Sequence, residues 1–444
     1  MDLNKFILFI FLLLIKISFQ KNTFLTFNFK NNINKTKIKS SSYYIDLSNN
    51  NFVTNINLGT PKQTLPLTIK FHLSSLAITS TLSIKNEFII KYNLNKSSSY
   101  QSENFTSLEF GIDEFNKGIK SQENFELNDK IKVNNLNFIL TTETYSEVSG
   151  ILGLNIKYDK DILENYSTLK QFKERNLISN CIFFFNFNDN NDNSPLNYNG
   201  QLIIGTYPHE YNPKKYKKEN YFEIKVKPQI DKNSELYEVK FLEIYYGNNN
   251  EEYDFTEEII SNIDASKTFI QGTTKFKKFI TEEFKKLYND KCKEVIFRLV
   301  VSFSCDQDID INKLKSIYIY NSNVNYTFVL NPSDLFSLYD NKLYFLITFK
   351  TYATLKNWTF GTIFLKKYNL VFDQESKVVG YYDNKNDIIN NSFYFKVILS
   401  FCFLMIVIFS LLMFYYKILS KKRKIRANEL DENIDYTPYK SINV

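Results

Sequence analysis

The chain has few side chains that could build a metal site or a histidine-dependent catalytic triad. His72 and His209 are the only histidines among its 444 residues. Zinc sites and Ser-His-Asp triads both depend on imidazole groups, so we expect no metal and no cofactor. Cys181 lies in the apolar run NCIFFFNF, and a cysteine in that setting is more often a buried free thiol than a nucleophile. Catalysis by carboxylates, of which the chain has 48, needs no imidazole.

The N-terminal residues have the pattern of a signal peptide. The run FILFIFLLLI, from Phe6 to Ile15, is too short to span a bilayer but has the length of a signal-peptide core. The segment KISFQ, which ends at Gln20, lacks the small residues favoured before a cleavage site, so a cleaved signal and an uncleaved anchor are both compatible with it. We assign residues 1–20 to the signal peptide and residues 21–42, which contain Lys but no Asp or Glu, to a basic, propeptide-like leader.

A second apolar segment predicts a transmembrane helix near the C-terminus. Val397 to Tyr416 are uncharged and mostly apolar, and about 20 such residues cross a hydrocarbon core as a helix. We therefore predict a helix over residues 393–416, a cytosolic tail over 417–444, and a type I single-pass protein of the secretory, endolysosomal or cell-surface membrane. Basic residues follow the apolar segment at once and fit the positive-inside rule: Lys417, Lys421, Lys422, Arg423, Lys424 and Arg426.

This topology accounts for the net charge of +7 and for the use of cysteine. Much of the charge comes from the juxtamembrane cluster, which suits the translocation machinery and anionic lipid, and we expect no nucleic-acid partner because no basic stripe carries interleaved aromatic residues. Cys292 and Cys305 are the plausible disulfide in an oxidising compartment, whereas Cys402 lies within the predicted span. Among the Asn-X-Ser/Thr sequons, we name these as candidates for glycosylation: Asn95, Asn104, Asn165, Asn325 and Asn357.

Short β-type runs dominate the chain from Tyr43 onward. FVTNINL, CIFFFNFN, GQLIIGTY and KLYFLITF are examples, and clusters of Asn, Asp, Ser and Gly separate them. Two segments instead repeat apolar residues at helical spacing, DILENYSTLKQFKERNLI and TTKFKKFITEEFKKLYND. The pattern predicts a mostly β ectodomain with few helices.

Several segments resemble, in the same order, those of the pepsin-like aspartic protease family (peptidase family A1). INLGTPKQTLPL resembles the opening strand of the family, and GILGL resembles the apolar-apolar-Gly element beneath the first catalytic loop. IDASKTFIQG resembles the second catalytic loop, and WTFGTIFLKKYNLVFDQESKVVGYY resembles the C-terminal segment. The resemblance runs from about Tyr43 to Asp383. It implies a bilobal β fold with a central cleft, an N-terminal lobe over residues 43–210 and a C-terminal lobe over 211–388.

The resemblance also implies where the catalytic residues lie. In the family each lobe supplies one Asp, and the two carboxylates share a proton, so that one acts as base on a water while the other donates to the substrate carbonyl. Asp264 stands at the second position, but Lys70 stands at the first, and no Asp or Glu occurs from Asn51 to Asn86. An ammonium group only donates hydrogen bonds and cannot replace the missing carboxylate. We predict instead a partly buried ion pair between Lys70 and Asp264.

Other positions around the two loops depart from the family as well. Each family loop continues with Thr and Gly, and the Thr grips the opposite loop, whereas this chain has other residues at those four places. The flap tyrosine of the family and its neighbouring tryptophan are also replaced. The resemblance assigns these positions to Phe71 and His72 in the first loop, Ala265 and Ser266 in the second, Phe110 before Gly111 in the flap, Ala77 for the tryptophan, and Thr362 for the usual Asp after Gly361.

Three functions are compatible with this pattern. The first is a membrane-anchored pseudoprotease whose cleft binds an extended peptide or a protein partner without cutting it, because such binding depends on backbone groups and pockets. The second is an active aspartic endopeptidase, through an unforeseen carboxylate or through a dimer that brings two Asp264 residues together. The third is a structural or adhesive surface protein. We favour the first.

Overall fold

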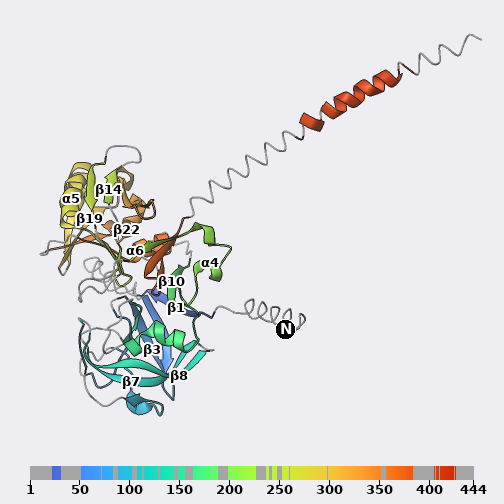
Figure 1. Ribbon diagram of the computed structural model, residues 1–444. Helices are drawn as coiled ribbons and strands as arrows, with labels where there is room; N and C mark the ends of the chain where they lie inside the picture. Colours follow the sequence, from blue (N-terminus) through green and yellow to red (C-terminus); the bar gives the residue numbers. More distant parts are fainter. Residues whose placement is uncertain are drawn as a thin grey trace, which may run out of the picture. The chain divides into compact units, whose positions relative to one another are not determined.

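The computed structural model describes most of residues 23–383 and part of the segment after residue 404 (Figure 1). The gaps in the first range are 32–51, 72, 84–88, 103–107, 113–114, 129–130, 145–148, 156–163, 189–198, 227–236, 240–242, 248–252, 260, 298 and 352–356. Beyond 404 the structure describes residues 405, 407–409, 411–424 and 426. The chain divides into two compact units, residues 1–382 and 383–444. Strands dominate the described part of the first unit, which confirms the prediction of a mostly β protein.

The largest sheet has 14 strands and joins segments that are far apart in the sequence. Its neighbours follow the order β12-β27-β26-β10-β11-β1-β2-β3-β9-β4-β8-β7-β5, and β6 pairs with β7. The strands are β1 (Leu25–Asn31), β2 (Phe52–Leu58), β3 (Gln63–Lys70), β4 (Leu76–Thr79), β5 (Gln101–Ser102), β6 (Leu108–Ile112), β7 (Phe115–Asn128), β8 (Ile131–Thr144), β9 (Gly150–Gly153), β10 (Ile182–Phe187), β11 (Asn199–Ile204), β12 (Tyr221–Lys225), β26 (Val371–Asp373) and β27 (Val378–Tyr382).

Two further sheets come from the segment between β12 and β26. The nine-stranded sheet has the order β13-β16-β25-β17-β24-β19-β23-β22 with β18 beside β19, and the four-stranded sheet has the order β15-β14-β20-β21. The strands are β13 (Tyr237–Val239), β14 (Glu243–Gly247), β15 (Phe255–Glu258), β16 (Ser261–Ile263), β17 (Ile270–Gln271), β18 (Cys292–Phe297), β19 (Val300–Asp306), β20 (Ser316–Asn321), β21 (Tyr326–Leu330), β22 (Phe336–Tyr339), β23 (Lys342–Phe345), β24 (Ile347–Lys350) and β25 (Trp358–Phe360).

The helices of the first unit are short, and α5 (Thr274–Tyr288) is the longest that the structure describes there. Its apolar residues recur every four positions and are buried, as in Phe276, Ile280 and Phe284. Such a stripe faces the core, while Lys278, Lys285 and Lys286 are exposed. Thr273 caps the N-terminus by accepting a hydrogen bond from the backbone N–H of Phe276 at 3.2 Å. The other α-helices are α3 (Thr168–Glu174), α4 (Pro208–Tyr211) and α6 (Thr362–Tyr368).

The helix predicted over residues 161–178 is shorter than expected. The structure has a 3-10 turn at Glu164–Tyr166 and then α3, which ends at Glu174. Ser167 forms a β-bridge with Ser75, and a residue in extended pairing cannot continue a helix. At the other end Asn176 has a φ of 56°, a left-handed conformation that Asn tolerates and that stops helices. Among the described residues of this segment, the helical spacing therefore corresponds to an α-helix only over Thr168–Glu174.

The disulfide between Cys292 and Cys305 is present, as predicted. The two residues face each other across the antiparallel pair of β18 and β19, so the bond closes the hairpin at its base. Cys181 is a buried free cysteine, again as predicted. Burial, together with a hydrogen bond to Glu375, raises the pKa of its thiol to about 12, which keeps the thiolate population low.

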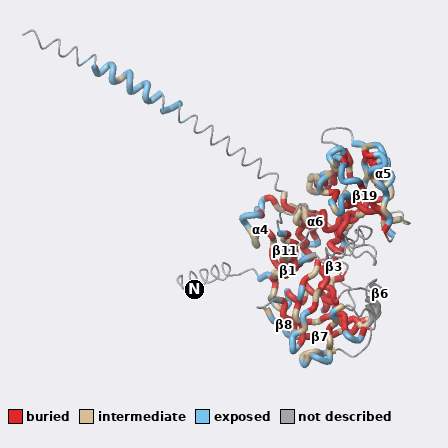
Figure 2. Tube along the Cα trace, turned by 180° about the vertical axis from the view of Figure 1, so that it is seen from behind, coloured by how far each residue is buried: buried red, intermediate tan, exposed pale blue. Residues whose placement is uncertain are grey.

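Strands from both predicted lobes share the 14-stranded sheet. β26 pairs with β10, and β27 pairs with β12, in antiparallel register. Residues of these strands belong to one large cluster of buried apolar residues that also includes residues of β1, β2, β16 and β25. Figure 2 colours the buried parts of the chain red. The last strands of the chain are thus part of the same core as the strands near its beginning.

The second unit contributes helical residues at 405, 407–409, 411–424 and 426. The predicted span over 393–416 falls partly outside the described residues. Among the residues that the structure describes, no helix is both long enough and apolar enough to cross a membrane.

Candidate functional site

The first candidate loop follows β3 and is held by β9. These strands pair in parallel, with Ile69 opposite Leu152 and Lys70 opposite Gly153. β4, which leaves the loop, pairs with the same β9 in antiparallel register. β9 therefore lies between the strand that enters the loop and the strand that leaves it. A Cβ atom on Gly153 would come within 2.4 Å of the carbonyl oxygens of Leu73 and Ser75, so only glycine lets the loop backbone cross so closely.

The second candidate loop, after β16, is built in the same way. β25 pairs in parallel with β16, with Ile263 opposite Phe360, and in antiparallel register with β17. A Cβ atom on Gly361 would meet the carbonyl oxygens of Lys267 at 2.4 Å and Phe269 at 2.3 Å. Gly361 thus has the role in this loop that Gly153 has in the first.

The strand registers define which residues of the two loops correspond. The parallel pair of Ile69 and Leu152 matches the pair of Ile263 and Phe360. The carbonyls that approach the two glycines belong to residues 73 and 75 in one loop and to residues 267 and 269 in the other. The antiparallel pairs lead to the same correspondence between the two loops, since Ala77 opposite Ile151 matches Gln271 opposite Thr359. By this correspondence, Lys70 occupies in the first loop the place that Asp264 occupies in the second.

Asp264 is buried, with 2% of its surface exposed. The backbone N–H and the hydroxyl of Ser266 both donate to its Oδ1 atom, at 2.8 and 2.5 Å. Its own backbone N–H donates to the carbonyl oxygen of Phe360 at 3.0 Å. One oxygen of the carboxylate is therefore engaged within its own loop. Sequence analysis assigned Ser266 to the glycine position and did not predict that it would donate hydrogen bonds to Asp264. The available signal was an Asp followed two residues later by a Ser, a spacing that allows such a local hydrogen bond.

Lys70 is also buried, with 8% of its surface exposed. Its carbonyl oxygen accepts a hydrogen bond from the backbone N–H of Leu154 at 2.9 Å, which ties the end of β3 to the residue after β9. The proposed ion pair between the Lys70 ammonium and the Asp264 carboxylate stays a prediction.

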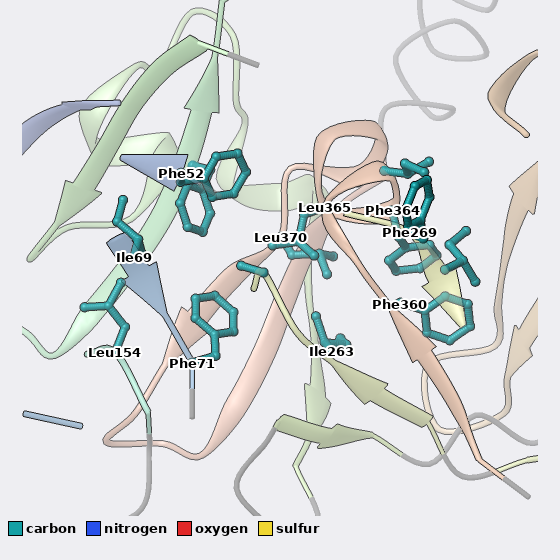
Figure 3. Packing of buried hydrophobic residues seen from close by; sticks show 14 of the residues in the cluster. Phe52, Ile69, Phe71, Leu154, Ile263, Phe269, Phe360, Phe364, Leu365 and Leu370 are labelled. Atoms are coloured by element: carbon teal, nitrogen blue, oxygen red, sulfur yellow. The ribbon is translucent and has the colours of Figure 1, made fainter. Parts of the chain in front are cut away.

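Phe71, which the resemblance assigns to the threonine position of the family, has a fully buried aromatic ring. Its centroid lies 4.9 Å from that of Phe372 and 5.4 Å from that of Phe183. Figure 3 shows the Phe71 side chain among the buried apolar residues near the end of β3. In the second loop the corresponding Ala265 is buried but small. The first loop is thus anchored by packing rather than by a hydroxyl, and His72 lies outside the described residues.

The remaining predicted site residues lie on the strands around the first loop or at the end of β25. Phe110 and Gly111 are in β6, which pairs with β7 in antiparallel register; the Phe110 side chain lies outside the described part. Ala77 is buried in a small cluster with Leu73, Ile139 and Ile151. The hydroxyl of Thr362 donates to the carbonyl oxygen of Lys267 at 2.9 Å, and this role in holding the second loop was not predicted. Among the described residues, no group of three His, Cys, Asp or Glu side chains could hold a metal ion.

Comparison with known families agrees with this duplicated loop arrangement. The sequence model of the family described as eukaryotic aspartyl protease matches residues 51–383. The chain belongs to the eukaryotic aspartyl protease family. Its match covers both loops and the strands that hold them. A search of curated proteins gives no match to this chain.

In this family two carboxylates act as a pair, and the resemblance assigns their positions to Asp264 and Lys70, an assignment that stays a prediction. Asp264 keeps the carboxylate of its loop. The equivalent place in the other loop holds an ammonium, which has no lone pair to accept a proton from water while it is charged. The chain thus has the framework of an aspartyl protease, with one carboxylate at the two equivalent positions.

Proposed function

We propose that this protein is a membrane-anchored pseudoprotease that binds an extended peptide or a protein partner in the cleft of its fold. The observation that carries the proposal is the equivalence of Lys70 and Asp264 in the registers of the two loops. A mechanism that needs two carboxylates sharing one proton cannot run on one carboxylate and one ammonium.

The surroundings of the first loop support the same proposal. Phe71 belongs to the apolar core, so apolar contacts with the core hold this part of the loop in place. A peptide-binding cleft, in contrast, depends on backbone hydrogen bonds and side-chain pockets, and these do not require the missing carboxylate.

Proteolysis of a denatured protein tests the loss of catalysis. The full chain in detergent is incubated with the substrate over about pH 3 to 7, the range in which carboxylate pairs titrate, with and without pepstatin. We expect no pepstatin-sensitive cleavage. Cleavage that pepstatin blocks, and that Asp264→Asn abolishes, would show that the protein is an active endopeptidase, whose second carboxylate is another residue of the chain or the Asp264 of a second copy.

Restoring the carboxylate tests whether the rest of the site is intact. We expect Lys70→Asp to gain pepstatin-sensitive cleavage, and Phe71 is kept because its ring packs in the core. The matched control is Lys70→Asn, because Asn has the size of Asp without its charge. Thermal unfolding of both variants, with and without pepstatin, checks that they fold and reports binding of a peptide-like ligand.

Alkaline extraction of membranes tests the anchor. A chain with a transmembrane helix stays in the pellet, whereas a peripheral protein is released. We expect the full chain to stay, and a chain truncated after Asp383 to be released.

A further inference from the structure

A lysine-rich loop is fixed to the end of the last strand of the first unit. This lysine loop, residues 212–220, connects α4 to β12 beside the exposed stretch near α4 in Figure 2. Four of its residues are exposed lysines: Lys214, Lys215, Lys217 and Lys218.

The loop is anchored by Tyr216, which lies between these lysines and has only 3% of its surface exposed. The Tyr216 ring lies 5.0 Å from that of Tyr382, the last residue of β27. Tyr221, at the start of β12, pairs with Tyr382 in antiparallel register. His209 Nδ1 lies 2.7 Å from the hydroxyl of Tyr382. Three neighbouring contacts therefore hold the loop at the point where the chain leaves the first unit.

The charge of the loop is strongly positive for its length. It contains the four lysines and one acidic residue, Glu219. The nearby Glu210 is turned toward its own helix, because its Oε2 atom accepts from the Thr206 hydroxyl at 2.7 Å and from the Tyr207 backbone N–H at 3.3 Å. Glu223, on β12, is exposed. Within the loop itself the lysines outnumber the acidic residues by four to one.

We propose that the lysine loop docks on anionic lipid headgroups in the luminal or extracellular leaflet of the membrane that holds the chain. This inference rests on the proposed membrane anchor. Only 13 residues separate Asp383 from Val397, the first residue of the uncharged apolar run, and at about 3.4 Å per residue they reach at most about 45 Å. A short tether keeps the local concentration of the membrane surface high. Each lysine near an anionic surface then strengthens the attraction by about fivefold.

Labelling of lysines in reconstituted protein tests the proposal. The full chain is placed in vesicles of phosphatidylcholine, with or without phosphatidylserine, and treated with an amine-reactive reagent. Mass spectrometry then gives the extent of labelling at each lysine. With phosphatidylserine we expect labelling of the lysine loop to fall severalfold at low salt and to recover at high salt, because salt screens the attraction. Labelling of Lys278 and Lys285, on the exposed side of α5, should not change.

Two variants make the result specific. In a variant with all four lysines of the loop replaced with Gln, labelling of Lys225, the next lysine along the chain, should be the same with and without phosphatidylserine. The matched control replaces four exposed lysines elsewhere, and should behave as the wild type: Lys278, Lys285, Lys286 and Lys293.

Equal labelling of the loop with and without phosphatidylserine would overturn the proposal. Protection by heparin in phosphatidylcholine vesicles, with no effect of phosphatidylserine, would instead assign the loop to a polyanionic glycan. Alkaline extraction of the same vesicles separates the two proposals. A chain that is released lacks the anchor, and its salt-dependent flotation with phosphatidylserine vesicles still reports whether the loop binds lipid.

Discussion

Phe71 contributes to the fold at a position where the family uses a threonine hydroxyl. Its ring packs against Phe372 from β26 and Phe183 from β10, strands that lie far from β3 in the sequence. A buried aromatic ring contributes dispersion and burial free energy but no hydrogen bond. The change therefore replaces a polar contact between two loops with a contact to the core, and the stability of the first loop depends on it.

We expect Phe71→Ala to lower the free energy of unfolding by about 3–5 kcal/mol, because it removes a buried ring and leaves a cavity. Denaturant unfolding measures the change. Leu338→Ala is the matched control, since Leu338 is 56% exposed, and its effect should stay below about 0.5 kcal/mol. Similar losses for the two variants would show that the Phe71 ring is not packed as described.

His209 gives a pH dependence of known sign. Burial lowers the pKa of His209, the neighbouring Glu210 raises it and Lys218 lowers it, and the net shift is downward from 6.5. The unfolded chain therefore binds the proton more tightly than the folded protein does. The contribution to stability is complete above pH 6.5 and is lost as the pH falls through the folded pKa.

We expect the wild type to lose more stability between neutral and mildly acidic pH than His209→Gln does. The difference should be below about 1 kcal/mol, because the histidine is partly exposed. Thermal unfolding at a series of pH values measures it. An unchanged difference between the two proteins across the series would contradict the shift.

At the scale of elements, two short parallel strand pairs and two glycines build both loops. Gly153 and Gly361 each let a loop backbone approach to distances that no Cβ atom permits. Each loop backbone depends on its apolar strands and its one glycine. It does not depend on which residue stands at the position of Lys70 or Asp264. The framework can therefore persist in a chain that has lost one carboxylate.

The start of α5 offers a test of local structure. Thr273 accepts from the Phe276 backbone N–H and donates to Glu257 Oε2 at 2.7 Å. Thr273→Ala removes both bonds, and we expect it to lower the free energy of unfolding by about 1–2 kcal/mol. Thr273→Ser keeps the hydroxyl and should cost less than half as much. Equal losses in denaturant unfolding would show that the hydroxyl has no capping role.

At the scale of the whole molecule, the two ends of the first unit depend on each other. β26 and β27 pair with β10 and β12, so the C-terminal strands complete a sheet that includes β1. A contact between segments this far apart forms only when the whole unit folds.

A chain that ends at Asn369 lacks β26 and β27, and we expect it not to fold, because β10 and β12 lose partners and Phe71 loses Phe372. A chain that ends at Asp383 keeps every strand of the unit and should fold. Limited proteolysis and circular dichroism compare the two. A folded product from the shorter chain would show that the last strands are dispensable.

The sequence alone determined the family, the mostly β class, the α5 segment and the disulfide, because ordered motifs, alternating apolar runs and helical spacing are local properties of the chain. FVTNINL, for example, is a strand from its first to its last residue. The long strand β7, FNKGIKSQENFELN, was not predicted. Its many polar residues leave no clear alternation of apolar and polar side chains, and the strand is defined by its pairing with β8.

Only the tertiary structure decided what the changed positions do. Ser266 holds Asp264, Thr362 holds the Lys267 carbonyl, and Phe71 enters the core. Tyr216 pins the lysine loop beside Tyr382. Each of these depends on which distant backbone or ring lies opposite a side chain, and that follows from strand register and packing across the unit rather than from neighbouring residues.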